Sequence, residues 1–118
     1  MSFYELVFIA RQDMSYADLD KVTESLIEIV KNYEGKVLLN EYWGLRSLSY
    51  EISNNKKGHY VFLGLEISID CKHELERRIK LSEHIIRHLV LRVEQVIATP
   101  LQALKDSTSE IKAINVTI

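Results

Sequence analysis

The hydrophobic positions of the N-terminal third predict a strand followed by a helix. Residues 3–10 are almost continuously apolar, short and bounded by polar residues, which is typical of a strand buried on most of both faces. From Ser15 onward apolar residues recur every three or four positions, with charged residues between them, as in an amphipathic helix that buries one face. Ser15, three residues before Asp18, predicts a capping-box-like start. Gly35 is expected to end this helix in a left-handed conformation.

The next apolar segments predict a β-hairpin. Residues 36–52 form a long extended stretch with an irregular pattern, and Gly44 inside it indicates a bulge or bend. The polar run 53–58 predicts a turn, and 59–69 predict the returning strand.

A second helix and a last strand follow. Asp70 is the expected cap of this helix, whose apolar stripe repeats every four residues at Cys71, Leu75 and Ile79. The β-branched residues of 85–97 predict the strand. The pattern leaves open which of two alternating sets faces the core: Leu89, Leu91 and Val93, or His88, Val90 and Arg92.

The order strand, helix, hairpin, helix, strand is that of the ferredoxin-like split β-α-β architecture. We therefore predict an α+β fold in which a four-stranded antiparallel sheet carries two helices on one face and leaves the other face open to a partner. Residues 1–97 are expected to form this domain. Pro100 breaks regular structure, so 98–118 are expected to form a C-terminal tail.

Composition agrees with one soluble domain. The chain has 118 residues, of which 47% are hydrophobic and 27% are charged. No apolar run approaches the roughly 20 residues that span a bilayer, and the N-terminus lacks a basic stretch followed by an apolar one. The lone Cys71 excludes an internal disulfide. We therefore expect a protein of the reducing cytoplasm without membrane association.

The charge is unevenly distributed. The formal net charge is −2, which by itself argues against nucleic-acid binding. Residues 1–52 hold five Lys/Arg and nine Asp/Glu, a net of −4, whereas 53–92 hold eight against five, a net of +3. Such an asymmetry suits a protein that contacts an anion with one side only.

The sequence offers little for catalysis. The four glycines never cluster into a phosphate loop, and the serines lack a nucleophile-elbow context. His84 and His88 are four apart, but they straddle a predicted change from helix to strand and have no carboxylate in a metal-ligand pattern. We predict a non-enzymatic protein with no cofactor, metal or small-molecule substrate.

Basic residues are the better candidates for a site. Those of the second helix form i,i+4 pairs, Glu74–Arg78 and Glu76–Lys80, typical of a solvated helix face. Arg46 lies within an apolar and aromatic run, where a solvated charge is less expected. The candidates for contact with RNA or a partner are Arg46, Lys56, Lys57, Arg87 and Arg92.

The strand after the turn does not match the aromatic RNA-reading strand of RNA-recognition-motif domains. Only Lys57 and Gly58 agree with that pattern, so base stacking is not expected there, and any RNA would be held by phosphate charge and RNA shape. The alternative is a stand-alone ferredoxin-like RNA-binding or metabolite-binding module. An acylphosphatase-like enzyme would need an arginine in a glycine-rich loop after the first strand, which residues 11–14 do not provide.

The run 43–52, Trp-Gly-Leu-Arg-Ser-Leu-Ser-Tyr-Glu-Ile, resembles the second strand of the bacterial small-subunit ribosomal protein six family, which carries Gly-x-Arg-x-Leu-Ala-Tyr-x-Ile. Four further stretches agree in order and spacing over residues 1–97: Tyr4-Glu5, Gly35, Lys57-Gly58-His59-Tyr60, and Ile86-Arg87-His88-Leu89-Val90.

The resemblance implies a ferredoxin-like structural protein of the cytoplasmic ribosome. It implies binding to the central domain of small-subunit ribosomal RNA together with small-subunit ribosomal protein eighteen, a basic partner that supplies much of the RNA affinity. A near-neutral or acidic net charge is usual in such a family. The chain departs from the pattern at Ser49, which replaces alanine, and at Glu51, where many relatives have proline. The tail has only Asp106 and Glu110, so a family modification of acidic tails is not carried over.

Overall fold

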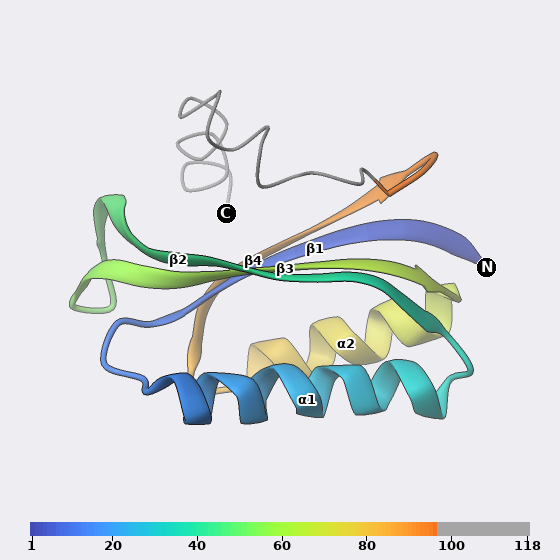
Figure 1. Cartoon of the computed structure of the whole chain (residues 1–118), viewed down its shortest axis with the longest axis horizontal. Helices are drawn as coiled ribbons and strands as arrows, with labels where there is room; N and C mark the ends of the chain where they lie inside the picture. Colours follow the sequence, from blue (N-terminus) through green and yellow to red (C-terminus); the bar gives the residue numbers. More distant parts are fainter. Residues whose placement is uncertain (97–118) are drawn as a thin grey trace.

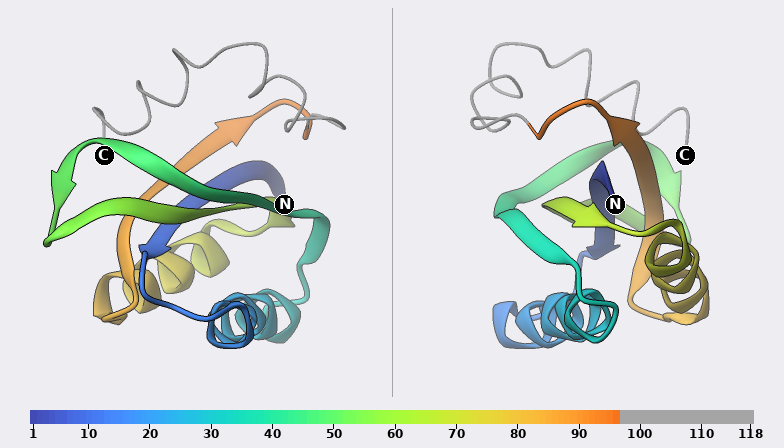
Figure 2. Two further views of the ribbon diagram at one scale, coloured as in Figure 1. Left: turned by 60° about the vertical axis from the view of Figure 1, so that its left-hand side comes forward. Right: turned by 90° about the vertical axis from the view of Figure 1, so that its right-hand side faces the viewer.

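The computed structural model describes residues 1–96, which contain six elements in the predicted order. They are β1 (Ser2–Arg11), α1 (Tyr16–Asn32), β2 (Lys36–Ile52), β3 (Asn55–Ile67), α2 (Ile69–Leu81) and β4 (Ile85–Val93). The strands form an antiparallel sheet in the order β2-β3-β1-β4. Both helices lie on the same side of this sheet (Figures 1 and 2), which confirms the predicted ferredoxin-like α+β class. Position 97, the predicted end of the last strand and of the domain, and the predicted tail 98–118 lie outside the described residues.

Helix α1 begins as predicted and ends differently. The Ser15 hydroxyl accepts a hydrogen bond from the Asp18 N–H at 3.1 Å. At the C-terminus the left-handed residue is Glu34, with φ 61°, and not Gly35. The Gly35 N–H donates to the Val30 carbonyl at 2.8 Å, and the Glu34 N–H donates to the Lys31 carbonyl at 3.0 Å. This is a Schellman arrangement in which a glutamate takes the position that glycine usually occupies.

Gly35 serves close packing instead. A Cβ at this position would lie 2.7 Å from Cγ2 of Ile67 and 3.1 Å from the Glu66 carbonyl oxygen. The chain can therefore pass from α1 into β2 directly beside the end of β3 only where residue 35 has no side chain.

The β2–β3 turn is shorter than the predicted turn 53–58. Ser53 and Asn54 both have positive φ, 49° and 65°, and form a two-residue hairpin turn of the kind that matches strand twist. Strand β3 therefore begins at Asn55 and not at 59, because the polar residues after the turn pair with β2, as Lys57 does with Ser47. Within β2 the predicted irregularity is confirmed, since the register shifts between Tyr42 and Gly44, where Gly44 has φ 100°.

Helix α2 is capped by Ser68 and not by Asp70. The Ser68 hydroxyl accepts the Cys71 N–H at 3.2 Å, and the helix begins at Ile69. Ser68 and Asp70 both have side chains that can cap a helix, and they are two positions apart. The sequence pattern alone therefore does not show which of them is the N-cap. Asp70 lies in the first turn, where the helix dipole favours a carboxylate. The predicted stripe of Cys71, Leu75 and Ile79 is buried.

The sheet has an apolar cluster on each face. The main core lies between the sheet and the helices. A second cluster covers the face away from the helices, which we call the helix-free face, so that this face is not simply open. Trp43 stacks on Phe62 there, with ring centroids 5.2 Å apart and planes within 10°. The cluster consists of Val7, Ile9, Trp43, Tyr60 and Phe62.

The structure also settles which side of β4 faces the main core. Val90 is paired with Leu6 of β1, and both pack into the cluster under the helices, so His88 and Arg92 share that side. Leu89 is paired with Val7 and lies on the helix-free face. Strand β4 ends at Val93.

The roles assigned to Glu34 and Gly35 at the end of α1 can be tested by substitution. We expect Glu34→Gly to raise the free energy of unfolding by up to about 1 kcal/mol, because glycine has no penalty at positive φ. Gly35→Ala should lower it by about 1–3 kcal/mol, because the new methyl group overlaps Ile67. Urea denaturation measures both. A stabilising Gly35→Ala would contradict this assignment.

Candidate nucleic-acid interface

Two arginines flank one glycine at the end of the sheet where β1 runs into α1. Arg46 of β2 and Arg11 of β1 are both paired with Gly58 of β3, one on each side of it. Directly paired positions project to the same face. Both arginines therefore lie on the helix-free face, two strand spacings or about 10 Å apart at the backbone.

Arg87 joins this pair from β4. It is paired with Ile9, which lies two residues before Arg11 on β1. Because residues two apart on a strand share a face, Arg87 lies on the same face as Arg11. The sheet thus brings together arginines from three strands, Arg11, Arg46 and Arg87, which we call the arginine end.

Within residues 1–96, neither Arg46 nor Arg11 is neutralised by a strong ion pair. The Arg46 Nε donates to the Trp43 carbonyl at 2.9 Å, which orients the guanidinium without neutralising it. Arg11 pairs with the exposed Asp13 at 3.3 Å, a contact of little strength in water. Gly58 between them has no room for a side chain, since a Cβ would lie 2.3 Å from Cγ2 of Ile9.

The other predicted candidates divide between this end and the opposite one. Lys56 and Lys57 are exposed on the hairpin beside the arginine end. Alternation along β3 places Lys56 on the side of Gly58, and Lys57, paired with Ser47, on the other side. Arg92 is paired with Tyr4, on the helix side of the sheet. It lies five residues along β1 from Ile9, or about 17 Å, and is not brought together with the others.

Sequence reasoning missed Arg11. It sits at the end of the first strand, and its position in the sequence does not reveal its neighbours. Only the antiparallel pairing of β1 with β3 puts it beside Gly58 and therefore opposite Arg46.

The basic residues of α2 lie on a solvated helix face as predicted. Glu74 pairs with Arg77 at 2.8 Å and with Arg78 at 3.4 Å, and its pKa is lowered, chiefly by the hydrogen bond from Arg77. The predicted pair of Glu76 with Lys80 is replaced by one with Lys72 at 2.9 Å, also at i,i+4 spacing.

Side chains with reactive chemistry are held in inert forms. Burial, followed by the influence of Glu74, raises the pKa of Cys71 to about 11, so the thiol stays protonated. Burial and a hydrogen bond with Tyr16 raise the pKa of Tyr42 to about 12, and its hydroxyl hydrogen bonds with Nδ1 of His59 at 2.8 Å. Within residues 1–96 no three His, Cys, Asp or Glu residues gather as metal ligands. In the same range no helix is long and apolar enough to span a membrane.

His88 lies on the opposite side of β4 from Arg87. It is paired with Phe8 and packs toward α2. Burial lowers its pKa, and Lys80 lowers it further, whereas Glu76 acts in the opposite direction. The imidazole is therefore held in its neutral form by the main core.

The fold and the site together define a ferredoxin-like α+β protein with a cationic end on one sheet face and no catalytic constellation in the part that the structure describes. Comparison with known proteins narrows this class. The family model described as Ribosomal protein S6 matches residues 3–92. The chain is 51% identical to small ribosomal subunit protein bS6 of Rickettsia felis, over 100% of this chain and 98% of that protein. It is 50% identical to bS6 of Rickettsia prowazekii over the same shares.

Solved structures agree on the fold. The crystal structure of 30S ribosomal protein S6 from Thermotoga maritima superposes with a TM-score of 0.73 at 24% identity, covering 95% of this chain and 96% of that one. The C-terminal domain of the MgtC protein from Mycobacterium tuberculosis shares the fold at a TM-score of 0.55 and 9% identity.

The chain belongs to the Ribosomal protein S6 family. The predicted resemblance is confirmed, and with it the prediction of a structural protein of the small ribosomal subunit that is not an enzyme. Family membership also places it on the ribosome, in the cytoplasm as predicted.

The half-buried His88 makes folding sensitive to acid. Its pKa in the folded protein lies below the ordinary value of 6.5, so the unfolded chain takes up the proton first as pH falls. We expect the free energy of unfolding to be unaffected by this group above about pH 7 and to decrease as pH falls through 6.5. Denaturation at pH 7.5 and 5.5 measures the difference in the free energy of unfolding between the two pH values. This difference should be smaller in His88→Gln. His73→Gln, on the exposed side of α2, should keep the wild-type difference; an equal effect of both would refute the assignment.

Proposed function

We propose that this chain binds the central domain of small-subunit ribosomal RNA together with small-subunit ribosomal protein eighteen, and that the arginine end contacts the RNA. The observation that carries the proposal is the convergence of Arg11, Arg46 and Arg87 from three strands onto one face, in a chain whose net charge is −2. A local cationic surface on an acidic protein attracts phosphate at one place and repels it elsewhere.

Contact through phosphates fits the helix-free face better than base stacking. The aromatic residues of β3 on this face, Tyr60 and Phe62, are 0% and 2% exposed. Stacking of unpaired bases requires exposed rings. Guanidinium groups instead form bidentate hydrogen bonds with phosphate oxygens, which makes arginine suited to this contact.

The charge balance favours joint binding with a basic partner. Three arginines and two neighbouring lysines neutralise only a few phosphates, and each phosphate contact contributes a limited, salt-dependent share of affinity. A second, basic protein bound beside this chain would add contacts and reduce the repulsion from its acidic regions. The family resemblance implies a basic partner of this kind, small-subunit ribosomal protein eighteen.

The arginine end is tested by charge removal at matched positions. We expect Arg46→Ala and Arg11→Ala each to weaken binding to the central-domain RNA in the presence of the partner, and to lower the slope of log affinity against log salt by about one. Arg92→Ala is the control, because Arg92 lies about 17 Å away on the other side of the sheet. Filter binding at several salt concentrations measures the slopes. Equal losses for all three variants would refute a contact localised at the arginine end.

Joint binding is tested with the two proteins separately. The chain alone should bind the RNA weakly, and addition of the partner should increase its affinity by a factor of ten or more, corresponding to about 1.4 kcal/mol. Titration of labelled RNA with each protein, and with both, measures this coupling. Tight and strongly salt-dependent binding by this chain alone would contradict the proposal.

A further inference from the structure

The hairpin between β2 and β3 extends past the end of β1. Strand β1 ends at Arg11, which is paired with Gly58, so residues 47–57 continue as a two-stranded projection that we call the hairpin arm (Figure 1). The β2–β3 register shifts between the pairs Ser47–Lys57 and Ile52–Asn55. Between these pairs, the four residues 48–51 of β2 lie opposite only one residue of β3, Lys56. A two-stranded ribbon is marginally stable by itself, and this irregularity weakens it further.

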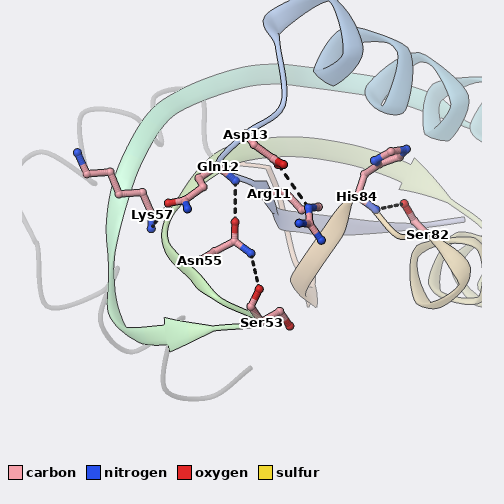
Figure 3. Close-up of polar contacts among 8 residues, drawn as sticks. All are labelled: Arg11, Gln12, Asp13, Ser53, Asn55, Lys57, Ser82 and His84. Atoms are coloured by element: carbon pink, nitrogen blue, oxygen red, sulfur yellow. Dashed lines mark hydrogen bonds and ion pairs between the residues drawn. The ribbon is translucent and has the colours of Figure 1, made fainter.

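Two side-chain amides tie the arm to the end of β1. The Gln12 N–H donates to Oδ1 of Asn55 at 3.0 Å, and the Lys57 N–H donates to Oε1 of Gln12 at 3.2 Å (Figure 3). Nδ2 of Asn55 donates to the Ser53 carbonyl at 2.9 Å, inside the arm. The side chains of Asn55 and Gln12 thus continue the β1–β3 ladder beyond its last backbone pair. We call this arrangement the amide clamp.

Burial makes Asn55 the decisive member of the clamp. Its side chain is 2% exposed, so water cannot readily replace a lost partner. Gln12 is exposed. Its side-chain oxygen fixes the position of the arm by accepting a hydrogen bond from the backbone N–H of Lys57.

The clamp links further cationic groups to the arginine end of the proposed function. The arm carries the exposed Lys56 and Lys57. On the other side of the clamp, Arg11 directly precedes Gln12 (Figure 3). Long lysine side chains on a loosely held ribbon would sample many positions. Holding the ribbon in one orientation before RNA arrives reduces the ordering cost of binding.

We propose that Asn55 and Gln12 are positioning residues, which act on RNA through the orientation of Lys56 and Lys57 and touch no phosphate themselves. This inference rests on the proposed function and extends it from the arginine end to the hairpin arm. It predicts that loss of the clamp removes the lysine contacts and leaves those of Arg46 in place.

The test measures the salt dependence of RNA binding by the full chain with its partner protein. Asn55→Ala and Gln12→Ala should each lower the slope of log affinity against log salt by about one to two, since one unit corresponds to one lost phosphate contact. Gln12→Ala guards against a folding defect, because Gln12 is exposed. Thr23→Val is the matched control: it removes another buried hydrogen bond, from Oγ1 to the Leu19 carbonyl within α1, and should leave the slope unchanged. A lowered slope in Thr23→Val, or an unchanged slope in both clamp variants, would overturn the proposal.

A double-mutant cycle separates positioning from other effects. In the background Lys56→Ala/Lys57→Ala, Asn55→Ala should cause no further loss of affinity, because the groups that it positions are gone. An equal loss in both backgrounds would overturn the proposal. Hydrogen exchange of the Gln12 amide in the free protein supplies a readout without RNA: exchange should accelerate in Asn55→Ala, and an unchanged rate would show that the clamp holds nothing.

The outcomes also distinguish this inference from the proposed function. If the lysine pair can be removed without effect on the salt slope while Arg46→Ala still lowers it, the positioning inference fails and the proposed function stands. If neither change affects RNA binding, the proposed function fails, and the inference with it.

Discussion

The rest of the structure depends on the ten-residue antiparallel ladder between β1 and β3. These are the two central strands of the sheet, and each is buried along most of its length. Because side chains alternate along a strand, the ladder assigns Leu6 and Phe8 to the core under the helices and Val7 and Ile9 to the helix-free face. A shift of one residue would exchange these sets, so burial on both faces makes the register highly specific.

The same ladder positions the cationic site. Its last pair, Arg11 with Gly58, lies where β1 leaves the sheet, and β2 adds Arg46 on the far side of Gly58. Close contact with Ile9 excludes a side chain at Gly58, so no side chain of β3 stands between the two arginines at this position.

Electrostatics explains how an acidic member of the Ribosomal protein S6 family can present a cationic surface. Net charge describes the long-range field, whereas a contact depends on the few groups within a Debye length, about 8 Å at physiological salt. Within that range the arginine end is cationic, although the whole chain carries −2. The paired charges of α2 contribute little, because Glu74 and Glu76 neutralise their neighbours locally.

The sequence by itself determined the order of elements, the fold class and the family, because apolar periodicity and motif spacing are local properties. It also proposed Arg46 and Arg87 as contact candidates, which stay predictions, and the structure places both at the arginine end. It misassigned the cap at Asp70, where the neighbouring Ser68 competes for the same role. It misassigned Gly35, which is required by close packing against Ile67 and not by a left-handed conformation, and it misjudged the length of the turn. Only the tertiary structure decided which side of β4 faces the helices, added Arg11 and separated Arg92. The physical reason is that the faces and neighbours of residues in a sheet follow from strand pairing between residues far apart in the chain. Local sequence pattern carries no information about this pairing.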